Sequence, residues 1–171
     1  TVGTVTSGDV LSQGLANASG VYAFSMNYEA AFGAGLDVIA RCRNQGFPTA
    51  GIAASSGGTS FTDETTANNS TTTDDITLLP ASAALNDAYY WGHGEKFDRL
   101  KLDVSQAGGA SFASLTWEYY NGSSWTALSN VSDATNNYKN SGNNIVSWDS
   151  PAGWATTTVN SQGPYYYVRA R

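Results

Sequence analysis

Histidine is the side chain best suited to acid–base catalysis near neutral pH, and this chain contains one, His93. It lies in the run Trp91-Gly92-His93-Gly94, whose glycines indicate a turn. A Ser-His-Asp triad would need this imidazole beside a nucleophile and a carboxylate, and no nucleophile-elbow motif accompanies it. We therefore predict a polar turn residue rather than a catalytic base.

Metal coordination has few candidate ligands in this sequence. One histidine and one cysteine, Cys42, are too few for a structural zinc site, which usually takes four Cys or His ligands. Two acidic pairs, Asp63-Glu64 and Asp74-Asp75, offer the oxygen ligands that calcium prefers, but they lack EF-hand spacing. We predict solvated loop carboxylates with no bound metal and no cofactor, and calcium binding is the alternative.

Paired carboxylates are the machinery of glycosidases, which place two carboxyl groups either about 5 Å or roughly 6.5–9.5 Å apart. Glu118 lies mid-strand between Trp117 and Tyr119, and Asp103 on a neighbouring predicted strand is its candidate partner. Period-two alternation places both carboxylates on polar faces, so we predict surface charges. The chain is accordingly predicted not to be an enzyme, with a glycosidase as the weakest alternative.

Aromatic residues are concentrated in the C-terminal half, which holds all five tryptophans. The run Tyr165-Tyr166-Tyr167 must place rings on both faces of its strand, so one small core cannot hold every ring. Three interpretations stay open: core plus ordinary surface, a subunit interface enriched in Tyr and Trp, or a platform on which sugars stack. The candidate interface or ligand-stacking residues are Trp91, Trp125, Trp154, Tyr120 and Tyr166.

The composition argues against several classes of partner. Charged residues make up 13% of the 171 residues, against about 25% in a typical globular protein. The net charge is −6, and the densest basic cluster is only Lys96, Arg99 and Lys101, so no nucleic acid partner is predicted. No apolar run approaches the ~20 residues of a membrane helix, and no signal peptide is predicted.

With a single cysteine, no intrachain disulfide is possible, and Cys42 is predicted to be a small buried residue.

The C-terminal part of the sequence is typical of strands joined by turns. Residues 97–104 alternate charged and apolar side chains, and Asn121-Gly122 favours a hairpin turn. Many short strands at this spacing predict a sandwich or barrel. The predicted strands are 75–79, 87–92, 97–104, 112–120, 125–128, 144–148 and 165–169.

The N-terminal part is less sharply patterned. Residues 1–20 are polar and Gly-rich, which predicts an arm. Alternation over 21–29 and 36–43 predicts a β-hairpin, and a helix over 28–44 is the alternative. The Ser- and Thr-rich run 55–75 is typical of a flexible linker, with room for an edge strand around Phe61.

An ordered set of landmarks runs through residues 74–171. It comprises Asp74-Asp75-Ile76-Thr77-Leu78-Leu79-Pro80, Asn86-Asp87-Ala88-Tyr89-Tyr90-Trp91-Gly92, Phe97-Asp98-Arg99-Leu100, Leu115-Thr116-Trp117-Glu118-Tyr119-Tyr120-Asn121-Gly122-Ser123-Ser124-Trp125, Trp148-Asp149, Val159-Asn160 and Tyr165-Tyr166-Tyr167-Val168-Arg169-Ala170-Arg171. This set resembles a β-module that recurs in structural proteins of tailed phages and prophages. The resemblance implies a jelly-roll-type sandwich, and a small copy with an N-terminal arm is similar to a capsid decoration, or cement, protein.

These expectations combine into one hypothesis. The fold is expected to be all-β, an antiparallel jelly-roll-like β-sandwich with an N-terminal arm and extra short strands. Residues 1–56 would form the arm with its hairpin, and 57–171 the sandwich domain. The resemblance implies a non-enzymatic virion protein, made in the host cytoplasm, that binds the major capsid protein or other virion proteins as a homo-oligomer, with a trimer favoured. A carbohydrate-binding or tail-fibre or baseplate adsorption module is the alternative.

Overall fold

The computed structural model describes residues 11–17, 20–26, 48–70, 72, 74–109 and 114–171. The chain divides into two compact units, Thr1–Asn44 and Gln45–Arg171. In the first unit, β1 (Leu11–Asn17) and β2 (Gly20–Met26) form an antiparallel hairpin in which Asn17 pairs with Gly20. Everything that follows about packing and sites concerns the second unit.

The N-terminal hairpin forms earlier in the chain than the sequence predicts. β2 covers most of the predicted strand 21–29, but its partner β1 lies inside segment 1–20, which was predicted to be an arm. β2 pairs with β1, which precedes it in the chain, so the described hairpin lies on the N-terminal side of the predicted one. The predicted strand 36–43, the alternative helix 28–44 and Cys42 lie outside the described residues.

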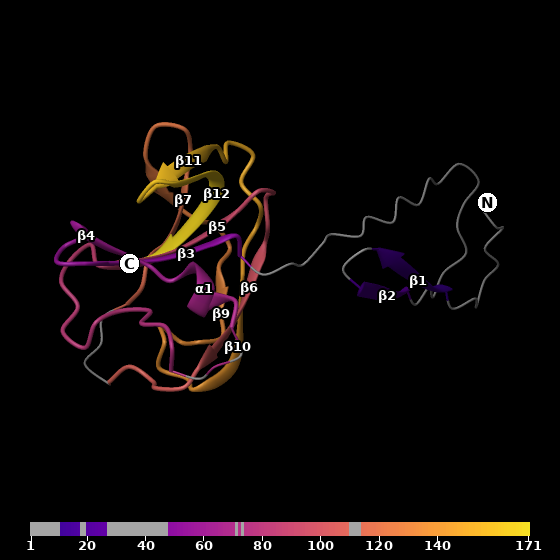
Figure 1. The fold of residues 1–171 in the computed structure, drawn as a ribbon, viewed down its shortest axis with the longest axis horizontal. Helices are drawn as coiled ribbons and strands as arrows, with labels where there is room; N and C mark the ends of the chain where they lie inside the picture. The colour runs from indigo at the N-terminus through magenta and orange to yellow at the C-terminus, as the bar shows by residue number, and fades with distance from the viewer. Residues whose placement is uncertain (1–10, 18–19, 27–47, 71, 73, 110–113) are drawn as a thin grey trace. The chain divides into compact units, whose positions relative to one another are not determined.

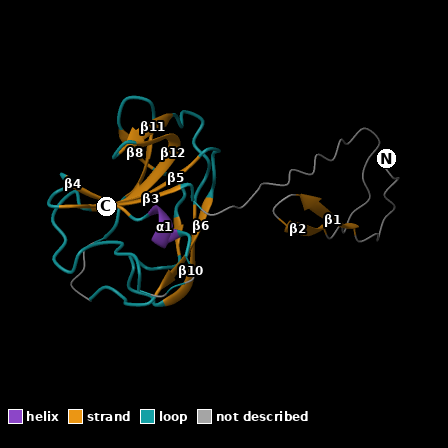
Figure 2. Cartoon of the chain, in the orientation of Figure 1, coloured by secondary structure: helices purple, strands orange, loops and turns teal. Residues whose placement is uncertain are grey.

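The second unit contains two antiparallel sheets (Figure 1). Within the described residues, its only helix is the short α1 (Thr65–Asn68), and no helix is long and apolar enough to cross a membrane (Figure 2). The small sheet has the order β6 (Arg99–Val104), β10 (Gly142–Ser147) and β9 (Ser132–Asp133). The large sheet has the order β4 (Ser60–Asp63), β3 (Ala50–Ser55), β5 (Ala88–His93), β12 (Gln162–Ala170), β7 (Trp117–Tyr120) and β8 (Trp125–Ala127), with β11 (Thr156–Val159) also paired to β12.

The two sheets face each other across one shared core. In β6 the apolar Leu100, Leu102 and Val104 are buried and the charged residues between them are exposed, as alternation predicts. They pack with Trp91 and Trp117 of the large sheet. The prediction of an all-β antiparallel sandwich is therefore confirmed, whereas this strand order does not by itself identify a jelly roll.

The central strand β5 is buried on both faces, which accounts for its continuous aromatic run. Trp91 points into the shared core, while Tyr90 points to the opposite, outer face of the large sheet. On this outer face Tyr90 packs with Ile52 and Tyr167 in a second cluster. The Tyr167 hydroxyl donates a hydrogen bond of 3.1 Å to the Gln162 carbonyl, so the start of β12 curls back over its own ring.

Gly92 of β5 leaves room for the ring of its cross-strand partner, Tyr167 of β12. A Cβ at this position would lie 2.5 Å from the buried Tyr167 ring, and that ring is held by its hydrogen bond to Gln162. We expect Gly92→Ala to lower the free energy of unfolding by about 1–3 kcal/mol, because the ring has nowhere to move. Chemical denaturation measures this loss. Gly94→Ala is the matched control, since no atom lies within 4 Å of its would-be Cβ, and equal losses for the two variants would contradict the packing argument.

Several elements differ from the sequence predictions. β3 pairs with both β4 and β5, so residues 50–55, which the prediction assigned to the N-terminal arm, belong to the large sheet. The Ser- and Thr-rich run 55–75 contains β4 as an edge strand and α1, where the main expectation was a linker. Residues 75–79 form no strand; Ile76, Leu78 and Leu79 instead pack on the shared core from a loop. The short β9 and β11 were not predicted, because neither has an apolar alternation of its own.

Candidate functional site

A row of directly opposed side chains crosses three strands on the outer face of the large sheet. Arg169 of β12 is paired with Tyr90 of β5 on one side and with Glu118 of β7 on the other. Cross-strand partners lie about 4.5–5.5 Å apart at Cβ, close enough for their side chains to interact. The register of three strands therefore assembles a polar row from residues that are far apart in sequence.

Glu118 is the centre of a largely buried ion triad. Its Oε2 accepts hydrogen bonds from Arg169 Nε at 2.7 Å and from Arg171 Nε at 3.0 Å. The side chains are 7% exposed for Glu118, 15% for Arg169 and 30% for Arg171. The prediction that Glu118 is a surface charge is wrong, because alternation identifies a second face of the strand but not how completely that face is covered.

Aromatic rings contact Arg169 of the triad. The Arg169 guanidinium lies 4.5 Å from the centre of the Trp125 ring, and it also donates a 3.0 Å hydrogen bond to the Tyr90 hydroxyl. Trp125 packs edge-on against Tyr90 and against Tyr120, its cross-strand partner, at centroid distances of 5.3 and 5.8 Å. We call Tyr90, Glu118, Trp125, Arg169 and Arg171 the arginine cluster; Tyr120 and the exposed Phe61 border it.

The electrostatics of the arginine cluster favour charged Glu118. Burial by itself would raise the pKa of this carboxyl group, but the hydrogen bonds and charges of Arg171 and Arg169 outweigh it and hold the pKa below its ordinary value of 4.5. The same contact raises the pKa of Arg171. Two guanidinium groups and one carboxylate leave the cluster with a net positive charge, on a chain whose net charge is −6.

The structure separates the five aromatic residues that the sequence singled out. Trp91 and Trp154 are 1% and 4% exposed in the shared core, and the Trp154 indole N–H donates to the Tyr167 carbonyl. Tyr166 is half-buried on the core-facing side of β12, against Trp154 and beneath Lys96. Only Trp125 and Tyr120 lie together on the outer face, where both are half-buried.

The candidate chemical groups are not assembled into a catalytic pair. Asp103 is exposed on the outside of the small sheet, while Glu118 lies on the outer face of the large sheet, so the core separates the two carboxylates. The prediction of a turn at Trp91–Gly94 is wrong for His93, which is the last residue of β5 and pairs with Tyr166 of β12. Its ring accepts a hydrogen bond at Nδ1 from the Glu95 backbone N–H at 3.0 Å. Within the described part of the chain, no three His, Cys, Asp or Glu side chains are grouped to hold a metal ion.

The carboxylates of the two acidic pairs accept hydrogen bonds from other parts of the chain. Asp63 accepts hydrogen bonds from the Thr65 backbone N–H at 2.9 Å and from the Gln162 side chain at 2.7 Å, and its contacts with Thr65 are the main reason that its pKa is lowered. Burial raises the pKa of Glu64, which accepts the Thr77 N–H. Hydroxyl groups donate to the other pair, Ser105 to Asp74 and Ser70 to Asp75.

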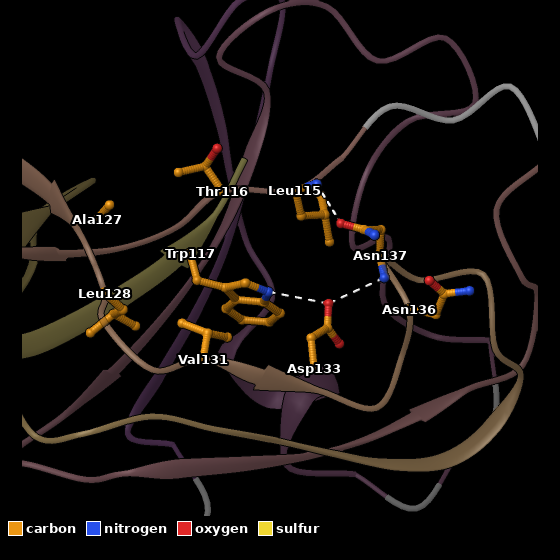
Figure 3. A pocket seen from close by; sticks show the side chains of 9 residues that line it. All are labelled: Leu115, Thr116, Trp117, Ala127, Leu128, Val131, Asp133, Asn136 and Asn137. Carbon is orange, nitrogen blue, oxygen red and sulfur yellow. Dashed lines mark hydrogen bonds between the residues drawn. The ribbon is translucent and has the colours of Figure 1, made fainter.

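A pocket of about 340 Å³ opens beside Trp117, where the chain enters β7 and where it leaves β8 (Figure 3). Its polar side is organised by Asp133, which accepts hydrogen bonds from the Trp117 indole N–H at 3.4 Å and from the Asn137 backbone N–H at 3.1 Å. The Asn137 side-chain oxygen accepts the Leu115 N–H at 2.7 Å. The lining residues are Leu115, Thr116, Trp117, Ala127, Leu128, Val131, Asp133, Asn136 and Asn137.

The polar rim of this pocket has an unusual backbone. Asn136, Asn137 and Tyr138 have φ values of 51°, 59° and 61°, three consecutive residues in the left-handed region. Asn tolerates this conformation, but for a bulky residue such as Tyr138 it is unfavourable by about 1–2 kcal/mol. Its ring is 5% exposed and packs edge-on against Trp117, which holds the turn in place.

Sequence reasoning missed both Arg169 and the pocket. A signal for the arginines exists, since Tyr167, Arg169 and Arg171 share one face of the last strand while Val168 and Ala170 share the other. The pocket has no comparable signal, because its residues come from a strand end, a loop and the short β9. Neither the models of known protein families, nor the curated proteins, nor the solved structures include a match to this chain.

Proposed function

We propose that this chain is a non-enzymatic structural protein of a tailed-phage particle, a capsid decoration protein that binds the major capsid protein as a homo-oligomer, with a trimer favoured. The observation that carries the proposal is the arginine cluster with its aromatic border. Protein interfaces are enriched in Trp, Tyr, Phe and Arg and depleted in Lys and Glu. On this face Trp125 packs on Arg169, and Tyr120 and the 39% exposed Phe61 border the arginine cluster. Glu118 matches only part of the charge of the two arginines.

The construction of this face suits a mechanical role. Arg169 is fixed by Glu118, Tyr90 and Trp125, so little side-chain freedom remains to be lost when a partner covers it. The face is built on paired strands rather than on a loop. Many copies, each bound modestly to a capsid lattice, would brace the shell through avidity.

Immunogold electron microscopy of intact parent particles, with antibody against the recombinant chain, tests the placement. The decoration proposal expects label spread over the head. Label confined to the tail tip or fibres would reject decoration and support the adsorption alternative. Absence of label from particles that contain the chain by mass spectrometry would reject a surface position.

Trp125→Ala tests the surface itself. We expect reattachment of the purified chain to stripped particles to weaken at least about tenfold, because central aromatic anchors supply most of the energy of an interface. Cosedimentation with particles measures the loss. Ile145→Ala is the matched control, since Ile145 is also an exposed apolar residue, 51% exposed, but lies on β10 of the small sheet. Equal effects of the two substitutions would contradict binding through the arginine cluster.

The alternative, a carbohydrate-binding or tail-fibre or baseplate adsorption module, is favoured by one observation. Trp125 and Tyr120 are half-buried neighbours on the outer face, so part of each ring remains free to stack on a sugar. Measurable glycan affinity that is lost in Trp125→Ala, together with tail labelling, would favour this function over decoration.

A further inference from the structure

We propose that the arginine cluster binds a carboxylate side chain of the partner protein, an aspartate or glutamate that lies beside apolar surface. The inference rests on the proposed function, because it takes this face as the one that the partner covers. It goes further by naming the chemistry of the partner at the point of contact. Three features support it: the charge of the cluster, its unused N–H donors and the exposed Leu85 next to it.

The first feature is an excess of positive charge at one point. The Nε atoms of Arg169 and Arg171 donate to the same oxygen of Glu118, so the two guanidinium groups lie side by side. Among the described residues, Glu118 is the only carboxylate that forms an ion pair with either arginine. Two neighbouring cations that share one anion repel each other, and a second carboxylate would neutralise the cluster. A neutral or basic group of a partner would leave the repulsion in place or increase it.

The second feature is a set of N–H donors without an acceptor. A guanidinium group has five such donors. Arg169 donates from Nε to Glu118 and from Nη1 to the Tyr90 hydroxyl, and Arg171 donates from Nη1 to the Asn86 side-chain oxygen at 3.3 Å as well as from Nε to Glu118. In the part of the chain that the structure describes, Nη2 of neither arginine makes a hydrogen bond.

These donors match a carboxylate. Its two oxygens accept charge-assisted hydrogen bonds from guanidinium groups, which are stronger than bonds between neutral groups. Arg171 is the more accessible of the two arginines, because its side chain is 30% exposed against 15% for Arg169. A carboxylate of the partner is therefore expected to contact Arg171 first.

The third feature is Leu85, a large apolar residue that is 81% exposed. It directly precedes Asn86, the residue that accepts from Arg171. Its loop is held by Asp87, which is 3% exposed and whose carboxylate accepts two backbone N–H groups at 2.7 and 2.8 Å. One exposed leucine is ordinary by itself, but this one adjoins the charged site. A protein surface that reaches Arg171 is also within reach of Leu85, and covering that side chain would stabilise the complex.

The same features favour a protein over a nucleic acid or a free anion. Nucleic acid recognition takes a face or stripe of Lys and Arg, whereas this face offers two arginines on a chain whose net charge of −6 repels a polyanion. A small free anion leaves Leu85, Phe61 and Trp125 uncovered. An acidic side chain within an apolar protein surface matches both the charge and the apolar residues.

Reattachment of the purified chain to stripped particles, measured by cosedimentation, tests the charge. Arg171→Gln removes the positive charge and keeps an amide that can donate to Glu118. We expect its binding to be at least about fivefold weaker, because a charge-assisted contact with the partner is lost. Arg99→Gln is the matched control, since it changes the net charge equally but lies on β6 of the small sheet, 56% exposed. Its binding should stay within about twofold of the parent chain.

The salt dependence of reattachment separates a charge contact from a loss of packing. Affinities are compared between about 50 and 300 mM NaCl, over which screening increases. We expect Arg99→Gln to respond to salt as the parent chain does and Arg171→Gln to respond less, because it lacks the ion pair that salt screens. Arg171→Lys keeps the charge without the planar fork, so we expect intermediate affinity with the salt dependence of the parent chain. This variant keeps the test decisive if Arg171→Gln fails to fold.

Leu85→Ala tests the apolar neighbour of the cluster. We expect reattachment to be at least about threefold weaker and the free energy of unfolding to be unchanged, because the side chain is 81% exposed. Ile145→Ala on the small sheet is again the control and should not affect reattachment. Equal binding of these two variants would overturn the apolar part of the proposal.

The carboxylate is rejected if Arg171→Gln binds as tightly as Arg99→Gln, or if the two respond equally to salt. If Trp125→Ala still weakens reattachment in that case, this face remains the interface and only the inferred chemistry of the partner is wrong. If Trp125→Ala has no effect either, the proposed use of this face fails together with the inference.

Discussion

Glu118→Ala should lower the free energy of unfolding by about 3 kcal/mol, the largest effect expected for any single charged residue here. The substitution leaves Arg169 and Arg171 beside a largely buried position without their carboxylate. The loss stays at the lower end of the range for broken buried pairs, because the Arg171 side chain is 30% exposed and can regain water. Urea denaturation monitored by tryptophan fluorescence measures it.

Two further variants show whether the loss comes from the ion triad. Glu118→Gln retains an oxygen that accepts from Arg169, so we expect a loss of about 2 kcal/mol. Asp103→Ala removes an exposed carboxylate from β6 and should change the free energy of unfolding by less than about 0.5 kcal/mol. If Glu118→Ala cost no more than Asp103→Ala, the triad would contribute nothing to stability.

The pH dependence of this stabilisation has a definite sign. The folded-state pKa of Glu118 is below its ordinary value of 4.5, so the unfolded chain takes up a proton first as the solution is acidified. The stability difference between the parent chain and Glu118→Gln should be constant from neutral pH to about pH 5, and should shrink as the pH falls further. Subtracting the two curves also cancels the opposite contribution of Glu64, whose pKa burial raises. A difference that grew on acidification would contradict the assignment.

Trp91→Ala should lower the free energy of unfolding by about 3–5 kcal/mol, because it removes the largest fully buried side chain from the shared core. The Trp91 ring is stacked with Trp117 at a centroid distance of 5.5 Å and lies 4.8 Å from the ring of Tyr89, so the cavity cannot collapse easily. Trp125→Ala removes the same side chain from a half-buried position and should cost only about 1–2 kcal/mol.

Chemical denaturation measures the free energy of unfolding of both variants, together with its slope against denaturant concentration. An unchanged slope means that the two variants unfold from equally compact states. We expect only Trp125→Ala to affect binding in the particle assay while the fold is kept. A smaller loss for Trp91→Ala than for Trp125→Ala would reverse their assignment to core and surface.

Local sequence determined the class of the fold and several of its elements. The alternation across Arg99–Val104 predicts β6 because a strand places successive side chains on opposite faces, and one of those faces packs on the core. Asn121-Gly122 predicts the β7–β8 hairpin, which forms with Gly122 at a φ of 100° and with the Asn121 side chain accepting the Ser123 N–H. These patterns extend over a few residues, so they can be recognised without knowledge of the rest of the chain.

Tertiary structure alone decided which faces of the strands are buried and what covers them. Alternation assigns Tyr89 and Trp91 to one face of β5 and Tyr90 to the other, but not whether water, a sheet or a ring covers each face. Glu118 is buried because the register of β12 brings Arg169 opposite it from 51 residues away. The pocket likewise depends on a left-handed turn held by the contact of Tyr138 with Trp117. Contacts between distant residues arise from strand pairing and packing, and no local pattern of residues encodes them.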